Sequence, residues 1–354
     1  MKIITKFAAM ILALLIISPL AGVYAGPPES VGGIVPIPGA RTTGFIEIDD
    51  TGDGSARIPV SIIMGTKDGP ILALVGGTHG YEYAPVLGLQ IAAKKIDPAA
   101  LSGTVIIVHV ANMPSFLGRT IYYSPADGAN LNRVYPGKAD GTLSQRIAHV
   151  ITAQVIEQSD YLVDMHSGDG NEDLRPYIYM PVTGNSEMDA KIKGMALAFG
   201  LDHIVIDRRD NLPADASLFT DMTGLTRGIP SMTTEAGRVG STAPELVRKN
   251  VDGVMNLLRH LKMLPGEEQP PQPTVWLGEY SVITSPADGL FIASVKGGNT
   301  VAAGGVLGQL VDFFGEPIET IRAPFAGMVN YVIATPPMRK GEPVAMVSKI
   351  VEDE

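Results

Sequence analysis

An imidazole and a carboxylate stand three residues apart in this chain, directly after an apolar run. The run, residues 71–75, predicts a buried strand, and His79 and Glu82 follow it through a glycine-rich turn. The rim of an α/β sheet, where strands end, is where such folds place their chemistry. Nitrogen and oxygen ligands of this kind suit zinc. A His-x-x-Glu pair alone is a weak signal, so the metal hypothesis needs a third ligand and a general base elsewhere.

Two further polar side chains stand at the ends of predicted strands. His166 follows the apolar run 161–165, and Glu235 follows residues 231–234. Two histidines and one glutamate would make a three-ligand zinc set with an open fourth position, which is the arrangement of a catalytic site. Glu235 would then be available as general base. The alternatives are that His166 is a buried, hydrogen-bonded histidine and that Glu235 pairs with Arg238.

Strands and helices alternate along residues 45–263, which predicts an α/β fold whose mainly parallel mixed sheet is flanked by helices. The expected strands are residues 45–48, 58–64, 71–75, 104–110, 161–165, 203–206 and 231–234. The expected helices are residues 85–95, 143–155, 188–199 and 241–263, the second of which begins with a capping box at Thr142.

The composition changes at residues 265–274, a proline-rich segment that reads as a stiff linker. Beyond it, short β-prone runs alternate with glycine and proline turns, so residues 275–354 are predicted to form a small all-β barrel or sandwich domain. The similar phrases at residues 285–289 and 323–327 indicate a quasi-repeat within it. The preceding α/β domain would then span residues 26–264.

The first 25 residues have the order of a secretory signal peptide. Lys2 and Lys6 precede an apolar run, and the small-residue exit at Ala25 predicts cleavage there. The apolar run is shorter than the ~20 residues that span a bilayer. We therefore expect a periplasmic or secreted protein, with an uncleaved anchor as the alternative.

Composition excludes several classes of function. The hydrophobic fraction is 45% and the charged fraction 18%, as in a globular protein with a sizeable core. The net charge is −10, and −12 once the two leader lysines are removed, which argues against binding to nucleic acids or anionic membranes. Because the chain has no cysteine, it can have neither a thiolate zinc site nor a cysteine nucleophile.

Four motifs in one order resemble the succinylglutamate desuccinylase/aspartoacylase family, whose members are related to zinc carboxypeptidases. The motifs are His79-Gly-Tyr-Glu82, Asn-Leu-Asn132-Arg133, Asp-Met-His166-Ser-Gly and Thr-Glu235-Ala-Gly, and their spacing matches over most of residues 45–262. The β-rich tail is similar to the barrel-like C-terminal domain of that family. The resemblance implies one zinc ion per chain, held by His79, Glu82 and His166. It also implies that Glu235 is the general base and then the proton donor to the leaving amine.

The same resemblance assigns the substrate contacts. Asn132 and Arg133 would hold a substrate carboxylate, and Arg119 would polarise the scissile carbonyl. One position departs from the family pattern, because Asn130 stands where several members carry an aspartate. A supporting carboxylate would then be missing or supplied by Asp127.

The implied activity is that of a zinc-dependent amidohydrolase, a deacylase that cleaves the amide bond of an N-acyl amino acid or a related carboxylate-bearing amide. The alternatives are a zinc carboxypeptidase or peptidoglycan-peptide hydrolase, and a catalytically inactive ligand-binding protein of the same fold. The expected partner is a small N-acyl amino acid or a short peptide, with no nucleic acid and no membrane after signal cleavage. Assembly into a homo-oligomer is left open.

The β-rich tail also resembles biotinyl and lipoyl carrier domains, which present a lysine eight residues before a comparable Ala-Pro step. Counting back from Pro324 reaches Glu316, and no lysine lies between Lys296 and Lys340. The sequence therefore does not support a carrier function.

Overall fold

A computed structural model describes residues 26–208, 213–268 and 273–352 of the chain. The predicted signal peptide, residues 1–25, lies outside the described residues, as do residues 269–272 of the predicted linker. Among the residues described, no helix has both the length and the apolar character needed to cross a membrane.

The α/β part of the chain contains helices and strands close to the predicted ones. Up to residue 166 these are β1 (Ala40–Ile48), β2 (Ala56–Met64), β3 (Lys67–Gly76), α1 (Tyr83–Lys95), β4 (Ser102–Val108), α2 (Met113–Gly118), η1 (Leu131–Arg133), α3 (Leu143–Gln154), η2 (Ile156–Gln158) and β5 (Tyr161–His166). There follow β6 (Glu172–Leu174), β7 (Tyr177–Pro181), α4 (Ser186–Phe199), β8 (His203–Asp207), η3 (Ala214–Ala216), α5 (Thr220–Leu225), β9 (Ser231–Glu235) and α6 (Pro244–His260).

The C-terminal part is built from strands. They are β10 (Val275–Thr284), β11 (Gly289–Ala293), β12 (Thr300–Val301), β13 (Val306–Val311), β14 (Pro317–Arg322), β15 (Gly327–Ile333), β16 (Pro337–Met338) and β17 (Pro343–Val351). Gly289 and Gly327, the last residues of the two similar phrases, each begin a strand.

The larger sheet confirms the α/β prediction but is more mixed than expected. Within the described residues it runs β1-β2-β4-β3-β5-β9-β7-β8-β10-β17-β15-β12, with β6 added to β15. The central strands β4, β3, β5 and β9 are parallel, whereas β7 runs antiparallel to β9 and both ends of the sheet are antiparallel. The predicted mixed sheet is therefore confirmed: its central strands are parallel as predicted, whereas its two ends are antiparallel.

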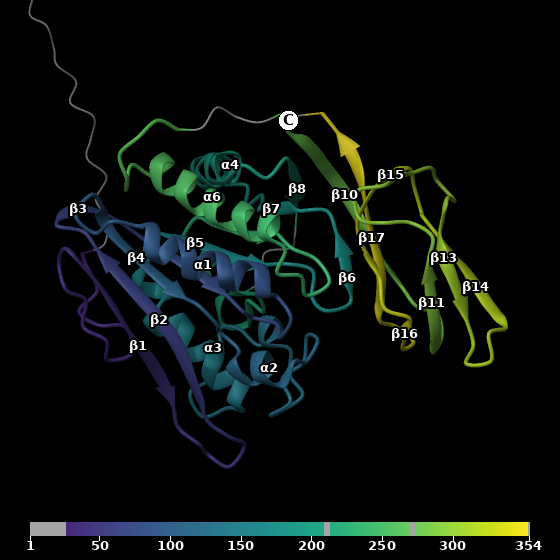
Figure 1. The fold of residues 1–354 in the computed structure, drawn as a ribbon, viewed down its shortest axis with the longest axis horizontal. Coiled ribbons are helices and arrows are strands. Elements are labelled where there is room, and N and C mark those ends of the chain that lie inside the picture. Colours follow the sequence, from purple (N-terminus) through teal and green to yellow (C-terminus); the bar gives the residue numbers. More distant parts are fainter. Residues whose placement is uncertain (1–25, 209–212, 269–272, 353–354) are drawn as a thin grey trace, which may run out of the picture.

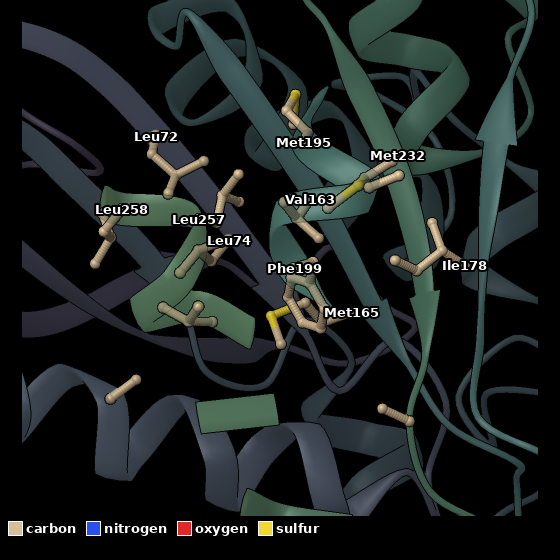
Figure 2. Packing of buried hydrophobic residues seen from close by; sticks show 14 of the residues in the cluster. Leu72, Leu74, Val163, Met165, Ile178, Met195, Phe199, Met232, Leu257 and Leu258 are labelled. Carbon is tan, nitrogen blue, oxygen red and sulfur yellow. The ribbon is translucent and has the colours of Figure 1, made fainter. Parts of the chain in front are cut away.

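Helices cover both faces of the central strands, which explains why those strands are apolar throughout. Leu72 and Leu74 of β3 pack in one buried cluster with residues of α1, α4 and α6. Figure 2 shows Leu72 and Leu74 in this cluster with Met165 of β5 and Phe199 of α4, and Figure 1 shows the three helices together over the sheet. The intervening residues of β3 face the opposite cluster, which includes α3. Alternating side chains of one strand thus enter two cores.

The C-terminal strands form a second β-rich region, of which β10, β12, β15 and β17 belong to the large sheet. β10 pairs in parallel with β8 and antiparallel with β17, so the large sheet continues past the linker. In the described part of the chain, β14, β13, β11 and β16 form a separate sheet (Figure 1). Phe291 and Leu310 of this sheet share a buried cluster with Val329 and Val347 of the large sheet. The second sheet supports a β-rich C-terminal region, and the predicted domain limits remain a prediction.

One partly buried histidine is expected to make stability depend on pH. His109 Nε2 lies 2.7 Å from Ser61 Oγ, and burial lowers the pKa of His109 to about 4. The unfolded chain binds this proton near pH ~6.5, so the free energy of unfolding should fall as pH drops from ~6.5 toward 4, by about 3 kcal/mol in total. His109→Gln should lack this pH-dependent part of the free energy of unfolding. Urea unfolding of wild type and His109→Gln across that pH range measures the difference. Parallel pH curves for the two proteins would contradict the assignment.

Candidate metal centre and substrate cavity

The carboxyl ends of three neighbouring parallel strands bring the predicted metal ligands together. β5 lies between β3 and β9, with Gly76 opposite Met165 and His166 opposite Glu235. The loop after β3 turns sharply at Gly77, where φ is +68° and a Cβ would come within 2.8 Å of Val110 Cα. Glycine is thus required at this position for the loop to carry its polar residues back over the rim of the sheet.

His79, Glu82 and His166 form a compact buried group. His79 Nδ1 lies 2.7 Å from Glu82 Oε1, and His166 Nδ1 lies 3.0 Å from Glu82 Oε2. One ligand atom from each of the three residues lies within 4.8 Å of the others. Burial raises the pKa of Glu82, but His166 and His79 outweigh it and hold that pKa at about 2. An ionised carboxylate between two imidazoles fits a divalent cation of the zinc class.

Both histidines are held by their second ring nitrogen. His166 Nε2 lies 2.9 Å from Asp164 Oδ2, and His79 Nε2 lies 3.2 Å from Asn130 Oδ1. With these nitrogens as the donors, both Nδ1 atoms are available to a metal, the arrangement that usually orients metal-binding histidines. Asp164 was not predicted, although it lies two residues before His166 on one strand and therefore on the same face.

Asp127 does not replace the carboxylate that Asn130 lacks. Its two oxygens accept hydrogen bonds from the backbone N–H of Ser144 at 2.9 Å and from the Ser144 hydroxyl at 2.8 Å. It therefore holds the first turn of α3. The amide oxygen of Asn130 occupies the position beside His79 instead.

Glu235 stands at the same rim, opposite His166 in the register of β5 and β9. Arg238 donates to Asp173 at 3.2 Å, so the predicted alternative of a Glu235–Arg238 pair is not formed. The Oε2 atom of Glu235 is buried and has no hydrogen-bond partner in the part of the chain that the structure describes. Burial raises the pKa of Glu235 well above its usual value; His166 opposes this shift and Glu82 adds to it. Such a carboxyl group is suited to taking up and releasing a proton.

These residues line a cavity of about 310 Å³, a size that suits a small ligand. Strands from both parts of the chain contribute to it, and its lining residues are His79, Glu82, Tyr122, Asn130, Asn132, Arg133, His166, Glu172, Tyr177, Tyr179, Asp207, Phe219, Asp221, Thr233, Glu235, Tyr280, Val282, Tyr331 and Pro343. The C-terminal strands β10, β15 and β17 thus form one wall of the cavity.

The predicted substrate residues differ in where they lie. Arg133 is exposed at the cavity, with its Cζ 4.6 Å from the centre of the Phe219 ring. Asn132 lines the cavity but is largely buried; its amide N–H donates to Asp164 at 3.3 Å, and its amide oxygen accepts from the Thr220 N–H at 2.8 Å. Arg119 is exposed in a left-handed conformation at the end of α2 and does not line the cavity, so the structure does not bring it to the site.

Most of the chain is similar to known proteins. The model of the succinylglutamate desuccinylase/aspartoacylase catalytic domain matches residues 68–261. The N-alpha-acetyl-L-2,4-diaminobutyric acid deacetylase of Halomonas elongata is 29% identical over 320 residues, which cover 87% of this chain and 92% of that protein.

Two solved structures are similar along nearly their whole length. A succinylglutamate desuccinylase/aspartoacylase from Rhodobacter sphaeroides superposes with a TM-score of 0.78 at 26% identity, covering 88% of this chain and 96% of that one. The product-bound ectoine utilization protein EutE (DoeB) from Ruegeria pomeroyi has a TM-score of 0.78 at 29% identity, covering 87% of this chain and 95% of that one.

Proposed function

Because the chain belongs to the succinylglutamate desuccinylase/aspartoacylase family, we propose that it is a zinc-dependent hydrolase that releases the acyl group of an N-acyl amino acid. The observation that carries this proposal is the buried group of His79, Glu82 and His166, whose ligand atoms lie within 4.8 Å of one another. Glu235 at the same rim supplies the general base that amide hydrolysis needs. Metal ligands and a base beside one cavity are the parts of a hydrolytic site.

Each of these residues has a separate role in the proposed hydrolysis. Zinc, when bound by the three ligands, lowers the pKa of a coordinated water toward ~7. Glu235 accepts the proton of the attacking water and delivers it to the leaving amine. Arg133 binds the substrate carboxylate, since its planar fork can donate to both oxygens. Asp164 and Asn130 keep the two imidazoles oriented.

The size of the cavity favours a small substrate over a long peptide. Its volume of about 310 Å³ suits an acylated amino acid, whereas a peptidoglycan strand or an extended peptide would need an open groove. The Halomonas elongata relative is named for deacetylating an N-acetylated diamino acid, which supports acetyl amino acids as the first substrates to test. We further propose that the protein acts in the periplasm or outside the cell after removal of residues 1–25.

Metal analysis together with a substrate panel tests this function. We expect about one zinc per chain, and hydrolysis of N-acetyl and N-succinyl amino acids at least tenfold faster in kcat/KM than of short unacylated peptides; tenfold corresponds to about 1.4 kcal/mol in the barrier. Chelation should abolish the activity and added zinc should restore it. A protein that binds no zinc, or one that binds zinc and cleaves only peptides, would contradict the proposal.

A further inference from the structure

Glu172 is a carboxylate of the cavity that the proposed hydrolysis does not use. It lies on β6, the short strand that pairs with β15 of the C-terminal region, with Glu172 opposite Ile333. Its side chain is partly exposed and lines the cavity. Glu172 therefore lines the same cavity as the metal ligands His79, Glu82 and His166.

Glu172 forms no ion pair with any residue in the described ranges. Its Oε1 accepts a hydrogen bond from the Tyr122 hydroxyl at 2.7 Å, and its Oε2 lies 3.4 Å from the backbone N–H of Asp169. Burial raises the pKa of Glu172 to about 7; the Tyr122 hydrogen bond opposes this, and the charges of Asp169 and Glu82 add to it. A carboxylate in this position is stabilised electrostatically when a ligand brings a cationic group to it.

Three tyrosines, Tyr122, Tyr177 and Tyr331, line the cavity together with this carboxylate. The Tyr122 hydroxyl donates to Glu172 at 2.7 Å, and Tyr177 and Tyr331 pack in one buried cluster with Leu174 of the same strand β6. Aromatic rings attract ammonium groups, by ~0.5–2 kcal/mol per ring depending on solvation. A carboxylate among tyrosine rings is the chemistry that recognises an organic ammonium group.

We propose that Glu172, together with Tyr122, Tyr177 and Tyr331, forms a subsite that binds a cationic amine in the side chain of the substrate. This inference rests on the proposed function and narrows its substrate class to N-acyl derivatives of diamino acids. Arg133 supplies the positive group for the substrate carboxylate, and Glu172 supplies the negative group for its distal ammonium. The two ends of the ligand are thereby distinguished by charge.

Isosteric substrates and a Glu172→Gln variant test the subsite. Nα-acetyl-L-ornithine is compared with Nα-acetyl-L-norleucine, and Nα-acetyl-L-2,4-diaminobutyrate with Nα-acetyl-L-norvaline, because each pair differs by an ammonium in place of a methyl group. The zinc-loaded wild type should hydrolyse the cationic member of each pair with the higher kcat/KM. Glu172→Gln should lower the ratio of the cationic to the neutral kcat/KM roughly 10- to 100-fold, as expected for the loss of a hydrogen bond to a charged group. Glutamine keeps the acceptor for the Tyr122 hydroxyl.

Glu279→Gln is the matched control, since Glu279 is exposed and binds Lys349 at 2.7 Å. It should leave the ratio unchanged.

Calorimetry with the free amino acids separates this inference from the proposed function. Wild type should bind L-ornithine more tightly than L-norleucine. In Glu172→Gln, the ratio of the norleucine Kd to the ornithine Kd should be at least tenfold smaller than in wild type. If no substrate is hydrolysed but the difference in binding depends on Glu172, the subsite stands and the proposed function fails. If the substrates are hydrolysed with the same cationic-to-neutral ratio in wild type and Glu172→Gln, Glu172 only orients Tyr122 and the subsite is refuted.

Discussion

A Glu235→Gln protein is expected to lose about 10²- to 10⁴-fold in kcat on N-acyl amino acids while it keeps its zinc. The substitution preserves the shape of the side chain and removes its capacity to carry a proton. Glu235 stands opposite His166 in the register of β5 and β9, and within the described residues its Oε2 atom has no hydrogen-bond partner. Glu235 also lines the cavity, so its carboxylate can take a proton from the attacking water and pass it to the leaving amine. Steady-state kinetics with zinc content measured on the same preparation test the prediction.

Glu187→Gln provides the matched control for this loss. Glu187 is exposed on α4 and binds Lys191 one helical turn away at 2.8 Å, so its replacement should leave kcat and zinc content unchanged. If Glu235→Gln also loses zinc, Glu235 is a ligand and not the base. If it retains full kcat, proton transfer occurs elsewhere and the mechanism is wrong.

The centre of the fold could be predicted because it depends on local apolar patterns. The run at residues 71–75 is apolar throughout since β3 has a helix-covered cluster on each face. The capping box at Thr142 is likewise a local signal, and it begins α3 as predicted. The order of the strands in the sheet was harder to predict from the sequence. β10 pairs in parallel with β8 although a proline-rich segment precedes it, and β7 runs antiparallel to β9. Such pairings depend on tertiary packing, to which strand patterns respond only weakly.

The residues of the candidate site that lie at strand ends could be predicted from the sequence. His166 and Glu235 were predicted to lie near His79 because their strands are parallel, and the structure places them at one rim. Loop residues were less predictable. Arg119 lies at the left-handed end of α2 and does not line the cavity. Tyr122 contacts Glu172 across 49 intervening residues, and no periodic pattern in either segment signals that contact.

Apart from the general base, the largest loss is expected from His166→Ala, because this side chain links two buried carboxylates. Its Nδ1 lies 3.0 Å from Glu82 Oε2 and its Nε2 lies 2.9 Å from Asp164 Oδ2. Without the imidazole, the metal group is reduced to His79 and Glu82, too few protein ligands for a stable catalytic zinc site. We expect no stoichiometric zinc in the variant, and a fall in kcat/KM of roughly 10³-fold or more, since several kcal/mol of transition-state stabilisation are removed.

Thermal unfolding separates the loss of metal from the loss of fold. A ligand present at a thousandfold its Kd stabilises the folded state by about 4 kcal/mol, so wild type should melt at a lower temperature after chelation. His166→Ala should melt at one temperature with and without zinc. His203→Gln is the control, because His203 is also buried and binds Asp202 at 2.8 Å, on β8 and away from the cavity lining. It should keep the zinc-dependent shift. A His166→Ala protein that still gained stability and activity from zinc would place the metal outside the group formed by His79, Glu82 and His166.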